Sequence, residues 1–478
     1  MTGADETDPR YQAALRELSG RGRFGIRLGL TRVRALLARL GDPQAGLPGV
    51  LIGGTNGKGS VQALVAAALR AAGYRVGQTP KPHLSSYRER LIVDGRPIGV
   101  GDFSSLLEEV LAETYAVARQ HSPPTEFEVL TAAAFSWFRR QRVDLAVVEV
   151  GMGGRLDATN AWQGGLTAIT NVALDHMEYL GPTVTAIARE KARIIKRGDA
   201  LALTGAQGEA LDVIRRRARR TGVPLRVVEP LPVLAMDRHG LVLDAGGGQA
   251  LRVGLLGRHQ SANATLARAI VAGMAEVGMA DVAPDIMGDA FAAARWPGRL
   301  ELLTLGTDGR ARPVDDASAA PDTDRPDVVL DGAHNPHGAQ ALAAALDELR
   351  PHLSDGPSTV LVGLLRDKDV AGVLAPLATS SALAGAAVVT TDVPDSPRTL
   401  PAAELAAAWR TAAGGGAQPQ AIGDATDALS TAVDATLSRR GPLVVCGSLY
   451  LVGHVRDHLL NGRHPILRPA ARRRNRHP

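Results

Sequence analysis

A glycine-rich turn with one lysine is the first stretch of this chain whose residue types can do chemistry. The turn follows a short apolar run at 50–52 and precedes apolar residues spaced as in a helix over 60–72. Glycines let backbone N–H groups approach phosphate oxygens, and a helix N-terminus adds favourable partial charge. We therefore predict a phosphate-binding loop in which Lys58 neutralises the β- and γ-phosphates, with a helix-capping turn as the alternative. The predicted loop consists of Gly54, Thr55, Asn56, Gly57, Lys58, Gly59 and Ser60.

A carboxylate and a histidine follow two further predicted strands. Glu149 lies at the end of the apolar run 144–150, and His176 comes after the run 166–172. Because ligands of parallel sheets collect at the carboxyl ends of the strands, both side chains are expected near the glycine-rich turn. Glu149, with the Ser60 hydroxyl opposite, offers oxygen ligands that suit Mg²⁺. The alternatives are that Glu149 caps a local turn and that His176 is an ordinary structural histidine.

Lysine is rare in this chain. Of 54 basic residues only five are lysines, namely Lys58, Lys81, Lys191, Lys196 and Lys368. A lysine kept in such a composition is expected to have a role that a guanidinium cannot fill. Meeting a phosphate as a compact charge and reacting as a neutral amine are two such roles.

The elements that position these residues alternate between strands and helices. Short continuous apolar strands separated by helices predict parallel sheets covered on both faces, which is an α/β fold. A region of shorter strands with glycine turns is predicted over 225–253. The strands are predicted at 50–52, 144–150 and 166–172, and the helices at 60–72, 127–140, 184–195, 259–277 and 283–294.

A break in the pattern at 296–299 marks the predicted boundary between two domains. The segment 306–326 is polar and contains proline, so we expect a flexible insertion on the surface. A second alternating set then predicts a smaller α/β domain. Its strands are expected at 328–330, 359–362, 386–390 and 443–446.

Composition excludes several classes of protein. Aromatic residues make up 3% of the 478 residues, which gives no broad platform for stacking nucleic-acid bases. The net charge is +5, but residues 463–478 hold six arginines and no acid, so the rest of the chain is at −1. The single Cys446 rules out an internal disulfide and a Cys-based zinc site. No apolar run reaches membrane-spanning length and the acidic N-terminus is unlike a signal peptide, so we expect a cytoplasmic protein with neither nucleic-acid nor membrane partners.

The glycine-rich turn resembles the ATP loop of the Mur ligase superfamily. It is most similar to the folate branch, the folylpolyglutamate synthases and bifunctional dihydrofolate synthases. Further strings match this branch in the same order, from about residue 27 to about residue 450. The matching strings are Pro82-His83-Leu84 with Glu89-Arg90, Thr125 to Glu128, Glu149 to Asn160 (EVGMGGRLDATN), Asp175-His176 with Glu178 to Gly181, Arg189 to Ala192, His259-Gln260 with Asn263-Ala264, Pro297 to Arg299, and Asp331 to Pro336.

The resemblance implies a domain organisation and an activity. A parallel-sheet P-loop ATPase domain with the pteroate site would cover 1–297, a Rossmann-like α/β domain 298–462, and an Arg-rich disordered tail 463–478. The activity implied is ATP-dependent ligation of L-glutamate to dihydropteroate, to tetrahydrofolate glutamates, or to both, through an acyl phosphate. A monomer is expected. A Mur-type ligase acting on a UDP-sugar peptide is the alternative, and a phosphate-loop switch protein without ligase chemistry is a more distant one.

The resemblance also implies a metal and nucleotide site. Two Mg²⁺ ions would be held by Ser60, Glu149, His176 and a carbamylated Lys191, whose amine has added CO₂. Carbamylation turns a cation into an anion with two oxygens, and only a desolvated, neutral amine reacts in this way. Read from the residues alone, Lys191 would be a solvated helix lysine. The residues implied to bind ATP outside the loop are Asn263, at the adenine, and Arg299, Asp331 and His334, from the second domain.

A pteroate site is implied by the same match. Phe127 would stack on the pterin, and Asp157 would accept a hydrogen bond from its amino group. Sequence alone would rank these positions as ordinary loop residues. The implied site consists of Leu28, Gly29, Leu30, His83, Thr125, Glu126, Phe127, Glu128, Leu156, Asp157 and Ala158.

One position departs from the family pattern. The chain has Lys81 in Thr79-Pro80-Lys81-Pro82-His83-Leu84, where the family has a serine that helps to hold Mg²⁺. A charged ammonium has no lone pair and cannot ligate a metal. We therefore expect Lys81 to contact the phosphates and to take over part of the charge neutralisation.

Overall fold

The computed structural model divides the chain into two compact units. It describes residues 5–21, 27–306, 308–314, 325–416 and 418–461, so the predicted tail at 463–478 lies outside the described residues. The first unit consists of Met1–Leu234, Val242–Gly254 and His259–Arg295. The second consists of Ala235–Leu241, Leu255–Arg258 and Trp296–Pro478.

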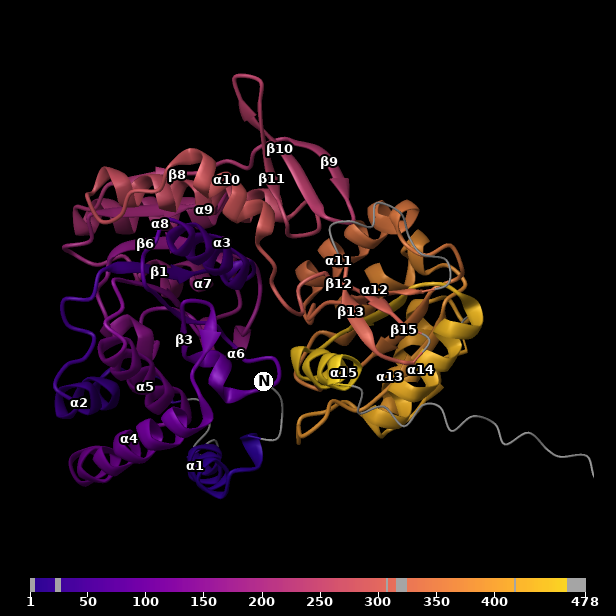
Figure 1. The fold of residues 1–478 in the computed structure, drawn as a ribbon, viewed down its shortest axis with the longest axis horizontal. Helices are drawn as coiled ribbons and strands as arrows, with labels where there is room; N and C mark the ends of the chain where they lie inside the picture. The colour runs from indigo at the N-terminus through magenta and orange to yellow at the C-terminus, as the bar shows by residue number, and fades with distance from the viewer. Residues whose placement is uncertain (1–4, 22–26, 307, 315–324, 417, 462–478) are drawn as a thin grey trace, which may run out of the picture. The chain divides into compact units, whose positions relative to one another are not determined.

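An eight-stranded sheet forms the centre of the first unit (Figure 1). The strands lie in the order β4-β3-β2-β5-β1-β6-β7-β8, and all neighbours from β2 to β8 are parallel. Every residue of β1 and β5 is buried, which requires both faces of the sheet to be covered. The strands are β1 (Gly49–Gly53), β2 (Val76–Thr79), β3 (Ile92–Val93), β4 (Arg96–Pro97), β5 (Leu145–Glu149), β6 (Gly165–Ile169), β7 (Leu201–Thr204) and β8 (Leu225–Val227).

Helices packed against one another cover this sheet. Helix α3 packs on α9 and α10, α7 packs on α8, and α5 packs on α2 and α4. The α-helices are α1 (Pro9–Ser19), α2 (Thr31–Arg39), α3 (Lys58–Ala71), α4 (Val100–Gln120), α5 (Glu126–Arg140), α6 (Met177–Leu180), α7 (Val184–Ala192), α8 (Gly208–Thr221), α9 (Gln260–Glu276) and α10 (Pro284–Ala293). Short 3₁₀ turns occur at η1 (Asp5–Thr7), η3 (Tyr87–Arg90) and η4 (Ala158–Ala161).

A separate three-stranded sheet has the order β11-β10-β9. Its strands are β9 (Val233–Asp237), β10 (Gly240–Gly246) and β11 (Gln249–Val253), within the region where the sequence predicts short strands and glycine turns. The turn between β10 and β11 is made by Gly246, Gly247 and Gly248, each with positive φ.

The second unit has a sheet of seven strands in the order β13-β12-β14-β18-β15-β16-β17. The five strands from β14 to β17 are parallel neighbours, while β12 is antiparallel to both β13 and β14. The strands are β12 (Glu301–Leu305), β13 (Ala311–Pro313), β14 (Asp327–Leu330), β15 (Thr359–Val362), β16 (Ala387–Thr390), β17 (Gln420–Ala421) and β18 (Leu443–Cys446). The helical segments are α11 (Pro336–Leu349), η5 (Arg350–His352), α12 (Val370–Ala378), η6 (Ser381–Leu383), α13 (Ala402–Ala412), α14 (Ala425–Arg439) and α15 (Leu449–Asn461).

The α/β architecture agrees with the predicted fold class. One prediction within it is wrong, because part of the expected loop over 306–326 is a strand. β13 pairs with β12 through Leu303 and Pro313, and Pro313 is tolerated because β13 lies at the edge of the sheet. Proline and charge favoured a loop in the sequence, whereas antiparallel pairing with the preceding strand β12 decided the conformation.

Candidate active site

The glycine-rich turn joins β1 to α3, as predicted. Gly57 is the N-cap of α3 with φ 82°, a left-handed conformation that glycine adopts at little cost. A Cβ at Gly54 would lie 1.9 Å from Thr170 Oγ1, and a Cβ at Gly57 would lie 2.1 Å from Asn263 Oδ1. Both glycines are therefore required by close approach of neighbouring side chains as well as by backbone angle.

A second segment, residues 170–173 after β6, holds the turn in place. The backbone N–H of Thr55 donates to Asn171 O at 2.9 Å, and that of Asn56 donates to Asn171 Oδ1 at 3.0 Å. Thr170 Oγ1 donates to Asn56 O at 2.6 Å, and Thr55 Oγ1 donates to Ala173 O at 3.2 Å. These bonds fix the loop backbone, so its conformation is set before a nucleotide binds.

Two lysines converge on one carbonyl of this loop. Lys58 Nζ lies 3.2 Å and Lys191 Nζ 2.8 Å from Gly54 O. Lys191 is 5% exposed, and burial, together with the charge of Lys58, lowers the pKa of Lys191 to about 7 although Asp175 and Asp157 oppose the shift. The Lys191 amine is thus neutral in part of the molecules near neutral pH.

Glu149 lies at the carboxyl end of β5, beside the loop. Its side chain is buried, and its Oε1 is 3.9 Å from Lys58 Nζ. Lys81 contacts it twice, since the Lys81 backbone N–H donates to Glu149 Oε2 at 3.1 Å and Lys81 Nζ donates to Glu149 O at 2.7 Å. The predicted neighbours Lys58 and Glu149 are therefore brought together.

The donor set beside the loop fits Mg²⁺ rather than a softer metal. Ser60 and Glu149 are both nearly fully buried and offer a hydroxyl and a carboxylate. Among the described residues no group of three or more His, Cys, Asp or Glu side chains is arranged to hold a metal. Mg²⁺ does not need such a cage, because it commonly binds through one or two carboxylates, substrate phosphates and water. His176 is the N-cap of α6 and lies 3.8 Å from Asp175 through Nε2, with 38% of its side chain exposed.

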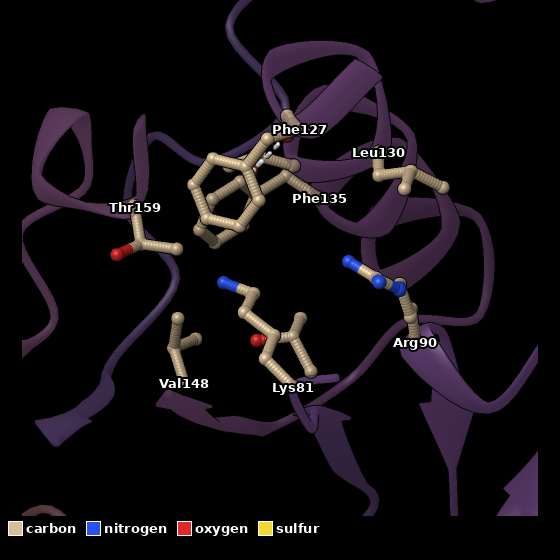
Figure 2. Close-up of a pocket in the computed structure, with 9 residues that line it drawn as sticks. Lys81, Arg90, Phe127, Leu130, Phe135, Val148 and Thr159 are labelled. Carbon is tan, nitrogen blue, oxygen red and sulfur yellow. Dashed lines mark hydrogen bonds between the residues drawn. The ribbon is translucent and has the colours of Figure 1, made fainter. Parts of the chain in front are cut away.

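A pocket lies between α5 and the ends of β2 and β5 (Figure 2). Its lining combines apolar rings with three hydroxyls and two cations. The lining residues are Thr79, Lys81, Arg90, Phe127, Leu130, Thr131, Phe135, Val148 and Thr159. Of the predicted pteroate residues only Phe127 lines this pocket, and the Lys81 ammonium lies 4.5 Å from the centre of its ring. Burial lowers the pKa of Lys81 to about 8.

Arg90, one of the two cations of the pocket, lies on η3 and is oriented by His83 from the segment before it. Arg90 Nε donates to His83 Nδ1 at 2.8 Å, and the His83 and Tyr87 rings lie 4.3 Å apart. Burial and the charge of Arg90 lower the pKa of His83 to about 3, so the imidazole is neutral and accepts this bond. Burial raises the pKa of Glu126, which is also hydrogen-bonded to Tyr87. The sequence missed the pocket role of Arg90, although the matched pair Glu89-Arg90 was a signal for it.

The other predicted pteroate residues make local structure. Thr125 and Glu128 form the capping box that begins α5, and Glu128 Oε2 also accepts from Arg32 Nε at 3.0 Å. Asp157 is buried and accepts from the backbone N–H groups of Met152 and Thr159 at 2.9 and 3.0 Å. The segments holding Leu28–Leu30 and Leu156–Ala158 are joined by a bond from Gly29 N to Leu156 O at 3.3 Å.

Three predicted ATP residues form a group of their own within the second unit. Asp331 follows β14 and accepts from the backbone N–H groups of Leu300 and Ala333, each at 2.8 Å. Burial raises the pKa of Asp331 although the neighbouring Arg299 opposes the shift. His334 Nδ1 is 2.7 Å from Gly332 O. Asn263, in the first unit, donates to Gln260 Oε1 at 2.8 Å and faces the phosphate loop at Gly57.

Known proteins match both units. Residues 52–271 match the family model of the Mur ligase middle domain, and residues 318–459 match that of the dihydrofolate synthetase C-terminal domain. The dihydrofolate synthase/folylpolyglutamate synthase of Mycobacterium tuberculosis is 35% identical over 471 residues, which covers 91% of this chain and 90% of that protein. The chain belongs to the folylpolyglutamate synthase/dihydrofolate synthase family. The family predicted from the sequence is thereby confirmed.

Other members of this family support the assignment. The folylpolyglutamate synthase of Lacticaseibacillus casei is 33% identical over 90% of this chain and 94% of that protein. The solved folylpolyglutamate synthase of Mycobacterium tuberculosis with ADP and AMPPCP has a TM-score of 0.79 and 34% identity, covering 94% of this chain and 99% of that one. The Escherichia coli FolC structure with DHPP and ADP has a TM-score of 0.73 and 28% identity, over 94% of this chain and 98% of that one. The α/β fold class is confirmed by these neighbours.

Proposed function

We propose that this chain is an ATP-dependent ligase that joins L-glutamate to dihydropteroate, to tetrahydrofolate glutamates, or to both. One arrangement carries the proposal: Lys58 on a preformed phosphate loop lies 3.9 Å from the buried Glu149 carboxylate at the carboxyl edge of a parallel sheet. Such an edge is where ligands of this fold class bind. Family membership over both units supports the choice of folate and glutamate as substrates.

The reaction would proceed in two steps. An oxygen of the substrate carboxylate attacks the γ-phosphorus of ATP, ADP leaves, and an acyl phosphate forms. The amine of L-glutamate then attacks the acyl carbon, phosphate leaves, and the nitrogen loses a proton to give an amide. The protein contributes placement and charge neutralisation rather than a covalent intermediate of its own.

The predicted phosphate-binding, metal-binding and nucleotide-binding residues have parts in this scheme. Loop N–H groups and Lys58 bind the phosphates, and Ser60 and Glu149 would hold Mg²⁺ with His176 nearby. The metal, for which two ions are expected from the family resemblance, would supply positive charge at the phosphate oxygens. The second unit would contribute to nucleotide binding through Arg299, Asp331 and His334, and Asn263 would meet the nucleotide from α9.

Lys191 is proposed to be carbamylated. Its amine is buried, contacts Gly54 O and has a pKa lowered to about 7, which are the conditions under which an amine adds CO₂. The carbamate would place one negative charge, shared by two oxygens, beside the phosphate loop. The unmodified ammonium instead places a second positive charge there, next to Lys58. A solvated helix lysine, the alternative from the sequence, does not agree with this burial.

A pteroate is the proposed acyl substrate, and a UDP-sugar peptide is not favoured. The rings of Phe127 and Phe135 line the pocket, which favours an aromatic ligand, and the relatives above are named for folates rather than for muramoyl peptides. A cytoplasmic location and a monomeric state stay predictions from the sequence. No helix of the described residues has the length and apolar character to cross a membrane.

The experiment is an assay in which ADP release is coupled to product formation. The purified chain receives Mg·ATP, L-glutamate and either dihydropteroate or tetrahydrofolate, side by side. We expect glutamylation of at least one substrate, with a Lys58→Met variant inactive on both. ADP release without a glutamylated product, or no ADP release from either mixture, would reject the proposed function.

A further inference from the structure

Lys81 enters the pocket from the end of β2. Its ammonium donates to Glu149 O at 2.7 Å and lies 4.5 Å from the centre of the Phe127 ring. Figure 2 shows the ammonium pointing toward Phe127, with the Arg90 guanidinium reaching into the same space from another side. By contrast, the ammonium groups of Lys58 and Lys191 both contact Gly54 O of the phosphate loop. The contacts of Lys81 therefore place it with the pocket rather than with the phosphate loop.

The Lys81 ammonium has hydrogen-bonding capacity to spare. An ammonium carries three N–H donors and accepts none. Among the described residues, Glu149 O is the one hydrogen-bond acceptor of Lys81 Nζ, and the face of Phe127 supplies a cation–π contact in place of an oxygen. A partly desolvated donor that faces a pocket favours a ligand with an acceptor oxygen.

The surroundings of the ammonium suit a flat ring more than a flexible acid. Phe127, Phe135, Leu130 and Val148 supply apolar walls around it. A hydrogen-bond donor among apolar walls fixes the orientation of a planar heterocycle, which is how small-molecule pockets commonly gain specificity. The pterin ring of a pteroate has one carbonyl oxygen that can accept such a bond.

We propose that Lys81 is a specificity-determining residue whose ammonium donates a hydrogen bond to the carbonyl oxygen of the pterin ring. This inference rests on the proposed function, since it takes a pteroate as the substrate. It replaces the earlier expectation that Lys81 contacts the phosphates. The backbone N–H of Lys81, which any residue other than proline retains, holds Glu149 in both cases.

The test compares binding of two ligands by two proteins. The ligands are dihydropteroate and its 4-amino analogue, in which an amino group replaces the ring carbonyl. The proteins are the wild type and a Lys81→Met variant, which keeps the length and packing of the side chain but loses the donor. Calorimetry without nucleotide gives the pteroate affinities, and a separate titration gives the affinity for Mg·ATP. Lys368→Met is the matched control, because it also removes a lysine but lies in the second unit, outside the proposed site.

We expect Lys81→Met to weaken dihydropteroate binding by about 10- to 100-fold, as for loss of a charge-assisted hydrogen bond. The affinity for Mg·ATP should stay within about twofold. The wild type should prefer the carbonyl ligand over the amino ligand, because two donors would meet in the second case, and the variant should lose most of that preference. Lys368→Met should behave as the wild type.

Three outcomes would overturn the inference. A dihydropteroate affinity that changes by less than about twofold in Lys81→Met would be the first, since the loss of a charge-assisted hydrogen bond weakens binding by more than that. An equal preference between the two ligands in both proteins would show that the ring carbonyl is not the partner. Weaker Mg·ATP binding with unchanged pteroate binding would return Lys81 to the phosphates. Failure of the wild type to ligate glutamate would instead reject the proposed function, and the coupled assay separates that case. A Lys81→Ser variant, with thermal unfolding of each protein, guards against loss of fold.

Discussion

Replacing Gly57 with alanine should destabilise the chain and weaken ATP binding, whereas the same change at Gly73 should do neither to a comparable degree. Both glycines flank α3 and both are left-handed, with φ 82° and φ 87°. They differ in their surroundings. A Cβ at Gly57 would lie 2.1 Å from Asn263 Oδ1, while a Cβ at Gly73 would meet nothing within 4 Å.

The magnitude follows from two contributions. A non-glycine residue in the left-handed region costs about 1–2 kcal/mol, and both variants pay this cost. Asn263 is 6% exposed and bonded to Gln260, so it cannot swing into solvent, and the overlap at Gly57 adds about 1–3 kcal/mol. Gly73→Ala should therefore lower the free energy of unfolding by about 1–2 kcal/mol and Gly57→Ala by about 2–5 kcal/mol.

Urea unfolding of the two variants measures the difference, and calorimetry measures their affinity for ATP. Displacement of the loop N–H groups in Gly57→Ala should weaken ATP binding at least about tenfold, the equivalent of 1.4 kcal/mol. A Gly57→Ala/Asn263→Ala double variant completes a cycle that isolates the contact. If the contact is the cause, removal of the Asn263 amide should restore at least about 1 kcal/mol of stability in the Gly57→Ala background.

Equal stabilities of Gly57→Ala and Gly73→Ala would refute this reasoning, because the overlap with Asn263 would then cost nothing. Additive effects in the cycle would refute it as well, since two residues in contact should couple. Loss of ATP binding in Gly73→Ala would also contradict it, because backbone strain at the far end of α3, away from the phosphate loop, would then be enough to disturb the nucleotide site.

Three further results are expected. Lys191→Arg should be inactive because a guanidinium does not add CO₂, and wild-type turnover should fall in CO₂-stripped buffer and return with bicarbonate. The pKa of His83 is lowered from 6.5 to about 3 in the folded chain, so between these pH values the unfolded chain binds the proton and the folded chain does not. The free energy of unfolding should therefore fall as the pH falls from about 6.5 to 3. Urea unfolding of His83→Gln should lack this part of the pH dependence. Asp327→Ala should lower the free energy of unfolding by about 3–5 kcal/mol, because it leaves the buried Arg238 guanidinium, now 2.8 Å from Asp327 Oδ1, without its carboxylate.

Controls separate these results from general damage. Lys368→Arg should respond to bicarbonate as the wild type does, and a wild type indifferent to CO₂ would contradict carbamylation. A stability difference between the wild type and His83→Gln that is the same at pH 5 and pH 7 would contradict the assigned neutral imidazole. An Arg238→Met/Asp327→Leu variant should recover most of the loss caused by Asp327→Ala, and equal instability of both would show that packing rather than charge is responsible.

Much of the fold was accessible from the sequence because its signals are local. Apolar runs bounded by glycine predict β1, β5 and β6, and apolar spacing predicts α3, α5 and α7 to within a few residues. The edge strand β13 was missed, because it lies in a polar segment with proline that is typical of a loop. It is a strand because it pairs with β12 across a turn. Local composition does not reveal that a short segment will be hydrogen-bonded by a neighbour.

Some residues of the candidate site could be predicted from local sequence signals, and others could not. Gly57 and Lys58 could be placed from the sequence, since a strand, a glycine turn and a helix in succession build a phosphate loop from one continuous stretch. The role of Asp157 was read from a resemblance alone, and in the fold its carboxylate accepts from two backbone N–H groups of its own loop. The sequence does not show that the Asp157 carboxylate is buried or that it accepts hydrogen bonds from these backbone groups.

The sequence by itself determined the family, the alternation of strands and helices, and the loop that would meet the phosphates, because these depend on motifs and on periodicity along the chain. Only the tertiary structure decided that Lys191 is buried beside Lys58, that Arg90 is oriented by His83, and that Lys81 faces Phe127. The contacts of Lys191 and Lys81 join residues far apart in the sequence, and that of Arg90 depends on how the segment between His83 and Arg90 folds. Their burial and their neighbouring charges, which set pKa and hydrogen bonding, exist only once the strands have brought their ends to one edge of the sheet.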